Sequence, residues 1–246
     1  MYNLLIAIGA ALLVFAPIAA WLGPWASIFP GVVAGGAAYF FLMRRSLKQL
    51  EALSMDAQKE FTAKRVDAGI KKLQDGFGLA KWQFLVASQI HAQLGMYLYV
   101  LERYDEAKPH LEKSFVRIGQ ARGMLGALLL KRKEYDAMIK VFEDSLRFNK
   151  KDGFLWSTYA YCLDRAGQRE KAIEALGRGL TESPSDEKLK ANQMALQNNE
   201  RLKMKAYGQE WWAFRLEAPP MDFVPAGMRG QLYQRKGYRT PPRERR

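Results

Sequence analysis

The stretch WSTYAYCLDRAGQREKAIEALGRGLTESP, residues 156–184, decides the fold of this 246-residue chain. Its first half carries apolar residues at helical spacing, and its second half places Ala172 and Leu176 four residues apart on one helix face. Gly167 stands between the halves, where a helix can end in a left-handed turn, and Pro184 follows the second half. The stretch therefore predicts two amphipathic helices joined by a short turn.

The same pattern occurs in two further segments upstream. Small residues in the first helix, Gly95, Gly126 and Ala160, are spaced by 31 and then 34 residues. Two positions of the second helix keep the same intervals: Ala107, Met138 and Ala172 at one, and Leu111, Phe142 and Leu176 at the other. Three markers in one register predict three consecutive helix pairs that stack on one another.

On these residues the chain resembles the tetratricopeptide repeat (TPR) family. The third copy matches the family pattern over its full length, the second matches it well, and the first is three residues short. The resemblance covers about residues 88–186. It implies two antiparallel helices per repeat, stacked into a right-handed solenoid that binds other proteins along its concave face. We therefore expect an all-α fold with about three repeats and a capping helix.

The first 43 residues contain no Asp, Glu, Lys, Arg or His. A bilayer core of about 30 Å needs roughly 20 apolar residues as helix, and this segment is about twice that long. Gly23 and Pro24 divide it. We therefore predict a transmembrane helical hairpin over 1–43, with spans at 3–22 and about 27–43.

Small residues on the two spans predict how the hairpin packs. Gly31 and Gly35 lie four residues apart on the second span, and Ala7 and Ala11 offer a matching small face on the first. Such pairs let two helices approach closely in a membrane.

Arg44, Arg45 and Lys48 follow the hairpin at once, and its turn carries no competing charge. The positive-inside rule then places this end, and the soluble domain behind it, in the cytoplasm of a bacterium with the hairpin in its inner membrane. A cleaved signal peptide is disfavoured because no basic region precedes the first apolar segment. A single tilted span with an interfacial extension stays open.

Composition divides the rest of the chain. A juxtamembrane basic helix and linker are predicted over 44–78, with a polar helix over 55–74 that breaks at 75–78. The repeats are predicted over 79–186 and open with a long helix from 79 to about 102. A capping helix to about 207 and an aromatic segment together take 187–215, and a basic, disordered tail takes 216–246.

The aromatic segment Trp211-Trp212-Ala213-Phe214 is too dense in large rings to be left in water. It either caps the last helix of the solenoid or folds back into the groove and competes with a partner. The sequence leaves both alternatives open.

The net charge of +13 is concentrated beside the hairpin and in the tail. Near anionic lipid each basic residue is worth about 1 kcal/mol, so we expect lipid contact from six residues: Arg44, Arg45, Lys48, Arg235, Lys236 and Arg239. Nucleic acid is a disfavoured partner because no aromatic and basic platform accompanies the charges.

Groups that could perform chemistry are few. The chain has two histidines, His91 and His110, and one cysteine, Cys162, which its apolar neighbours mark as a buried side chain. It has no His pair at metal-binding spacing, no phosphate-binding glycine loop, and no nucleophile with a suitable base. We expect no enzymatic activity, no cofactor and no metal.

The resemblance assigns partner binding to the first helix of each repeat. By position it selects Gln89, Ala92, Met96, Tyr99, Gln120, Gly123, Ala127, Leu130, Lys131, Phe154, Ser157, Tyr161 and Arg165. This face is mostly small and apolar, which suits an amphipathic helix or an extended apolar peptide. It lacks the Lys, Asn and Arg set with which chaperone-binding members of the family hold a peptide carboxylate.

These features predict a membrane-anchored scaffold or adaptor that presents a cytoplasmic groove to other proteins. The alternative is an accessory or regulatory subunit of a membrane enzyme or of a secretion or envelope assembly complex. An import receptor on a eukaryotic organelle is a third and weaker alternative.

Overall fold

A computed structural model describes residues 2–63, 65–83 and 85–217, and within these ranges it is helical with no strand. The described residues divide into two compact units, one within residues 1–128 and 140–149 and one within residues 129–139 and 150–217, and each is described by itself. The helices are α1 (Tyr2–Leu22), α2 (Pro24–Thr62), α3 (Val66–Asp75), η1 (Gly76–Lys81), α4 (Val86–Val100), α5 (Tyr104–Glu112), α6 (Gly119–Lys131), α7 (Tyr135–Leu146), α8 (Gly153–Arg165), α9 (Arg169–Glu182), α10 (Glu187–Gln197), η2 (Met204–Tyr207) and α11 (Gln209–Ala213).

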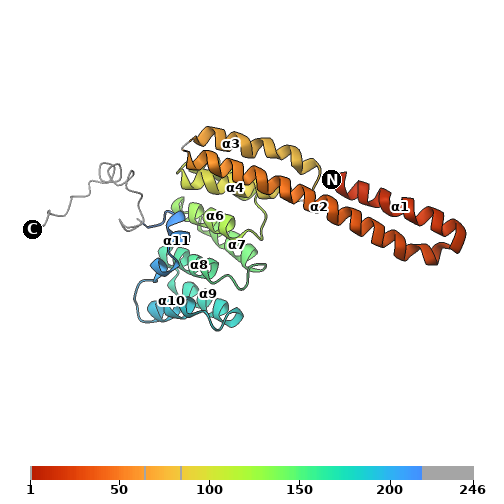
Figure 1. The fold of residues 1–246 in the computed structure, drawn as a ribbon. Helices are drawn as coiled ribbons and strands as arrows, with labels where there is room; N and C mark the ends of the chain where they lie inside the picture. The colour runs from red at the N-terminus through yellow and green to blue at the C-terminus, as the bar shows by residue number, and fades with distance from the viewer. Residues whose placement is uncertain (1, 64, 84, 218–246) are drawn as a thin grey trace, which may run out of the picture. The chain divides into compact units, whose positions relative to one another are not determined.

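The first unit begins with α1 and α2, which form the predicted hairpin (Figure 1). Gly23 makes the turn with a φ of 85°, a conformation that glycine adopts without strain. A methyl group added at Gly35 would lie 2.9 Å from Ala11 Cβ, and one added at Gly31 would lie 3.2 Å from Phe15 Cβ. The predicted small-residue interface is therefore confirmed.

The second helix of the hairpin continues far beyond the predicted end of the apolar span. It runs unbroken through 39 residues from Pro24 to Thr62, a length of about 58 Å. The predicted separate polar helix over 55–74 is wrong, since the chain instead breaks after Thr62 and resumes as α3 at Val66. The physical reason is that residues 44–62 contain neither glycine nor proline to stop the helix.

The later half of α2 packs with α3, η1 and α4 around a core of its own (Figure 1). The rings of Phe61 and Tyr97 stack with their centres 4.0 Å apart. The predicted long helix from residue 79 is wrong, because η1 takes residues 76–81 and α4 begins at Val86, after Leu85 with a φ of 71°. The buried members of this core are Leu50, Ala57, Leu73, Val86, Ile90 and Leu94.

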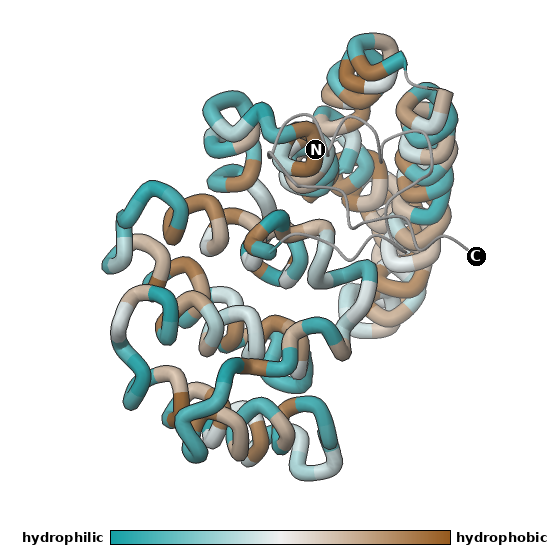
Figure 2. Tube along the Cα trace, turned by 90° about the vertical axis from the view of Figure 1, so that its left-hand side faces the viewer, coloured by the Kyte–Doolittle hydropathy of each residue, from teal (hydrophilic) through white to brown (hydrophobic). Residues whose placement is uncertain are grey.

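The first two predicted repeats correspond to α4 with α5 and to α6 with α7. A methyl group added at Gly95 would lie 2.7 Å from Leu111 Cδ2, and one added at Gly126 would overlap the ring of Phe142. The recurring small residue therefore faces the recurring bulky one within each helix pair, as the register predicts. Figure 2 shows hydrophobic (brown) and hydrophilic (teal) residues together on the helical turns, as expected of helices with one packed and one exposed face.

The second unit contains the third helix pair, α8 with α9, and α10 packs against both helices. Asp152 and Asp186 cap the starts of α8 and α10, each accepting backbone N–H bonds with its carboxylate. The predicted closing helix to about residue 207 ends early. Here α10 stops at Gln197, and Asn199 takes a left-handed φ of 59°.

Candidate partner-binding surface

The last described segment of the chain covers the face of α8 that the sequence assigns to partner binding. The ring of Phe154 lies 5.0 Å from that of Tyr207 and 5.1 Å from that of Phe214. The ring of Tyr161 lies 4.7 Å from Trp211, edge to face. Trp211 and Phe214 are both 0% exposed. The aromatic segment therefore lies on the predicted binding face, while α10 forms the cap of the helix pair.

Buried polar groups fix the start of this segment. The hydroxyls of Ser157 and Tyr207 are 2.8 Å apart, and the Asn192 amide donates to Ser157 Oγ at 3.1 Å. The backbone N–H of Lys203 donates to Asn192 Oδ1 at 2.7 Å. Burial raises the pKa of Tyr207 to about 12, so its hydroxyl stays protonated and able to donate.

Glu217 fixes the other end of the segment. The Tyr161 hydroxyl donates to Glu217 Oε1 at 3.3 Å, and the Trp211 indole N–H donates to Glu217 Oε2 at 3.2 Å. Arg165 donates to the Tyr161 hydroxyl at 3.1 Å and lies 3.8 Å from the same carboxylate. Burial, with Glu217 nearby, raises the pKa of Tyr161 to about 12. The described residues thus include the first two residues of the predicted tail, and the rest of that tail lies outside them.

Residues selected in the first two repeats divide by burial. Ala92, Tyr99, Gly123 and Ala127 are buried and pack within the helix layers. The others reach the surface: Gln89, Met96 and Leu130 are half-buried, and Gln120 and Lys131 are exposed. About half of the selected residues therefore serve packing, three of them as small side chains and Tyr99 as a large buried ring.

Three of the six residues predicted to contact lipid lie on α2. Arg44, Arg45 and Lys48 are all exposed on α2, at the end of its apolar stretch. The other three residues of the predicted set, Arg235, Lys236 and Arg239, lie outside the described residues.

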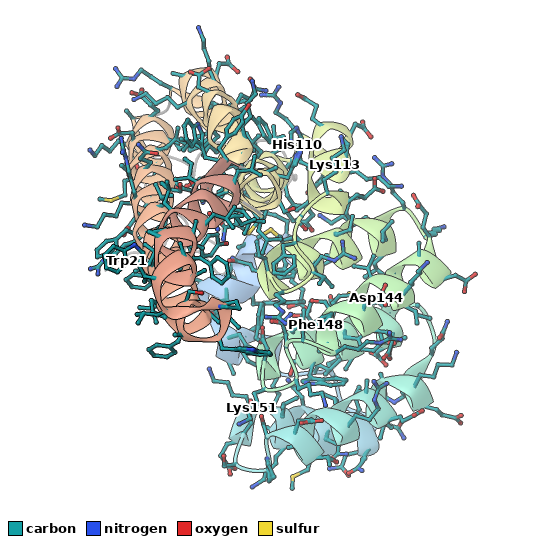
Figure 3. All side chains as sticks on the ribbon, turned by 90° about the vertical axis from the view of Figure 1, so that its right-hand side faces the viewer. Trp21, His110, Lys113, Asp144, Phe148 and Lys151 are labelled. Carbon is teal, nitrogen blue, oxygen red and sulfur yellow. The ribbon has the colours of Figure 1, made fainter. Side chains whose placement is uncertain are left out.

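The two histidines, which the sequence left apart, meet between α4 and α5. Their Nδ1 atoms are 2.9 Å apart, so one ring donates to the other. Burial lowers the pKa of both imidazoles, and Lys113, next to His110 in Figure 3, lowers both further. The signal that could have found the pair is the antiparallel register of the first repeat, which brings residues 19 apart together.

Few described groups are suited to catalysis or metal binding. Within the described ranges no group of three or more His, Cys, Asp or Glu side chains is placed to hold a metal ion. Cys162 is 0% exposed, and burial raises the pKa of its thiol, so the reactive thiolate is disfavoured. The predicted burial of this cysteine is confirmed.

Comparison with known proteins yields likenesses among solved structures alone. No family model matches the chain, and no curated protein matches it. Among solved structures it is similar to one titled "MamA RS-1 ArsTM double mutant", at 19% sequence identity and a TM-score of 0.46, covering 68% of this chain and 92% of that one. A likeness of this degree concerns the fold alone, and no function is transferred from it.

Fold and site together define a class of protein. It is an all-α protein with an N-terminal hairpin of two long apolar helices, followed by helix pairs of the TPR-like type. Helix pairs of this kind have extended surfaces along their length.

Proposed function

We propose that this chain is a membrane-anchored scaffold or adaptor, held by its hairpin in a bacterial inner membrane and binding other proteins on the cytoplasmic side. The observation that carries the proposal is the exposure of the apolar hairpin. Only 6% of the most apolar 18-residue stretch of α1 and 17% of that of α2 are buried. Leu13 is 78% exposed and Phe29 76%. A core helix of a soluble protein would bury such residues, whereas lipid accommodates them.

The dimensions of the hairpin support the proposal. Tyr2 and Trp21 stand 19 residues apart on α1, which is about 28 Å along a helix and close to the thickness of a bilayer core. Trp21, labelled in Figure 3, is 89% exposed, and Trp25 beside the turn is 87% exposed. Amphipathic rings at both ends of an apolar stretch are typical of the two membrane–water interfaces.

Two measurements test the anchor and its orientation. Alkaline extraction should leave the chain in the membrane pellet, and release into the supernatant would contradict the anchor. Because Cys162 is fully buried, a single introduced cysteine can be labelled selectively. We expect Lys59→Cys to react only after the membrane is permeabilised and Ala26→Cys, beside the turn, to react from outside. The opposite pattern would overturn the cytoplasmic orientation. Gly23 is avoided because its positive φ would strain a cysteine.

We propose a binding role without catalysis for the helix pairs. The partner would be an amphipathic helix or an apolar peptide, and the residues still open to it in the first unit are Gln89, Met96 and Gln120. Affinity capture of the full chain in mild detergent, followed by mass spectrometry, should recover proteins that are lost with Met96→Glu but retained with Lys151→Glu, an exposed control. Equal recovery with both variants would contradict this surface.

An accessory subunit of a membrane complex is the second candidate, and the unbroken α2 favours it. One rigid helix joins the hairpin to the core formed by α3 and α4, so contacts of the spans with another membrane protein would be passed directly to the domain. Replacing residues 1–43 by an unrelated hairpin separates the candidates. A scaffold should keep its partners, and a subunit that packs through its spans should lose them.

A further inference from the structure

A buried polar cluster joins the foot of the hairpin to the domain. The Asn3 amide donates to Ser46 Oγ at 2.9 Å and to Gln83 Oε1 at 3.1 Å, and the Gln83 amide donates to the Tyr39 hydroxyl at 3.2 Å. Asn3, Ser46 and Gln83 are 2%, 5% and 8% exposed. The backbone N–H of Asn3 also donates to the carbonyl of Trp82. Three segments distant in sequence are thus fixed at the level where the apolar hairpin ends.

Two depressions open beside this cluster. One, of about 230 Å³, is lined by Arg45, Ser46, Gln49, Leu79 and Trp82 together with Asn3 and Leu42. The other, of about 590 Å³, is more open and shares Arg45 and Gln49 with the first. Its other lining residues are Phe41, Arg44, Lys48 and Ala52. The lining of the two depressions contains three basic side chains and no acidic one, so they favour an anion.

The donors in the lining suit a phosphate group. Arginine binds phosphate oxygens with two parallel N–H bonds, and Arg45 lines both depressions. The Ser46 hydroxyl accepts from Asn3 and keeps its own hydrogen as a donor. The Gln49 amide adds a third donor beside them. A monoanionic phosphodiester would accept hydrogen bonds from all three groups.

Neighbouring apolar and aromatic residues indicate a lipid rather than a free phosphate. Phe41, on the rim, is 70% exposed, next to the apolar surface of the hairpin. Trp82 is 45% exposed, and its ring packs edge to face on Tyr2 with centres 5.2 Å apart. Rings of this kind prefer the interface between acyl chains and head groups, which is the depth at which a lipid phosphate lies.

We propose that the foot of the hairpin is a binding site for an anionic phospholipid. Arg45, Ser46 and Gln49 hold the phosphate, Arg44 and Lys48 attract the negative head group, and the acyl chains follow the exposed face beside Phe41. The site rests on the proposed function in one respect, since it requires the hairpin to lie in a membrane. It fixes the depth of α2 in the bilayer and couples the first helix pairs to the lipid surface.

The test uses the full chain in mild detergent, titrated with phosphatidylglycerol or phosphatidylcholine, with bound lipid counted by native mass spectrometry. Arg45→Gln and Lys59→Gln each remove one positive charge from α2, but Lys59 lies 14 residues further along, about 21 Å from the site. Phosphatidylglycerol should bind more tightly than phosphatidylcholine. We expect Arg45→Gln to weaken phosphatidylglycerol binding about fivefold, and Lys59→Gln to weaken it less than about twofold. Ser46→Ala should weaken binding with the fold intact by circular dichroism.

Three outcomes would overturn the site: equal losses for Arg45→Gln and Lys59→Gln, equal affinity for the two lipids, or no bound phosphatidylglycerol. Glycerol phosphate added at millimolar concentration distinguishes the two sources of phosphate. If it displaces the lipid completely, the site recognises soluble phosphate esters and the lipid assignment is wrong. Alkaline extraction of the same variants reports on the anchor separately, so loss of the lipid site with the chain still in the pellet leaves the proposed function standing.

Discussion

In both the hairpin and the helix pairs a glycine lies against the neighbouring helix, but the two regions differ in whether their large apolar side chains are exposed or buried. In the hairpin, Gly35 lies against Ala11 while large residues such as Phe29 face outward. In the second helix pair, Gly126 lies against Phe142, and the large residue itself is 0% exposed. Small residues permit close helix approach in both regions, but the surroundings decide where bulky side chains go. In the membrane setting that we propose, close packing would hold the hairpin together, whereas removal of apolar surface from water dominates in the helix pairs.

Removing a bulky marker from a helix pair should have the largest effect. Phe142→Ala leaves a cavity against Gly126 and should lower the free energy of unfolding by about 3–5 kcal/mol. Phe148→Ala removes the same side chain from a site that is 53% exposed, where Arg117 lies over the ring. Its cost should stay near 1 kcal/mol or below. Denaturant unfolding followed by circular dichroism in one detergent gives both values. Equal costs would show that the contact between Gly126 and Phe142 is not a main source of the stability of this helix pair.

Adjacent glycines of the hairpin give the next comparison, with opposite signs. A methyl group at Gly35 would meet Ala11 at 2.9 Å, whereas one at Gly36 would meet nothing within 4 Å. We expect Gly35→Ala to destabilise the hairpin by about 1 kcal/mol or more, because the helices must separate. Gly36→Ala should stabilise it by about 0.5–1 kcal/mol through helix propensity. The thermal unfolding midpoint in mild detergent reports both, and a shift of the same sign for both would contradict the packing.

Contacts within one repeat could be predicted from the sequence better than contacts between distant segments. The repeated spacing of small and bulky residues predicted the helix pairs, and the structure places Gly95 against Leu111 within the first of them, because each repeat is a local unit. The length of α2 was missed although the absence of glycine and proline from residues 44–62 indicated it. The start of α4 was missed because it depends on Leu85 adopting a left-handed φ and on packing among α2, α3 and α4. Local patterns do not contain such contacts.

The candidate partner-binding face of α8 could likewise be predicted from the sequence only in part. The sequence selected Phe154, Ser157 and Tyr161 as one face of a helix, and the structure brings all three to one surface. The sequence could not show that Tyr207 and Trp211 cover that surface. The segment with Tyr207 and Trp211 lies some 50 residues after this face of α8 in the sequence. Its position depends on a turn after α10 and on the side-chain amide of Asn192, and neither can be predicted from sequence periodicity.

Acidification should distinguish the first helix pair from the rest. Both imidazoles have pKa values below the ordinary value near 6.5, so the folded state resists protons that the unfolded state accepts. Stability is then fully present above about pH 6.5 and falls as the pH drops below it. The described charged groups that act on the pair are Lys113, which opposes protonation, and Glu106, which favours it at His110. Unfolding measured from pH 7.5 to 5.5 should show a decline that His91→Gln with His110→Gln flattens. An unchanged slope in the double variant would contradict this origin.

The smallest effect should come from the charged end of the aromatic segment. Arg165 lies 3.8 Å from Glu217 with 53% of its side chain exposed, and its guanidinium lies over the Tyr161 ring at 5.1 Å. Water and salt screen such a pair, so Arg165→Ala should cost about 0.5–1 kcal/mol, most of it from contact with the ring. A double-mutant cycle with Glu217→Gln should give a coupling below about 0.5 kcal/mol that vanishes at high salt. A coupling of several kcal/mol would mean that charge, rather than burial of Trp211 and Phe214, holds the segment on α8. A partner with a competing acidic group could then displace it.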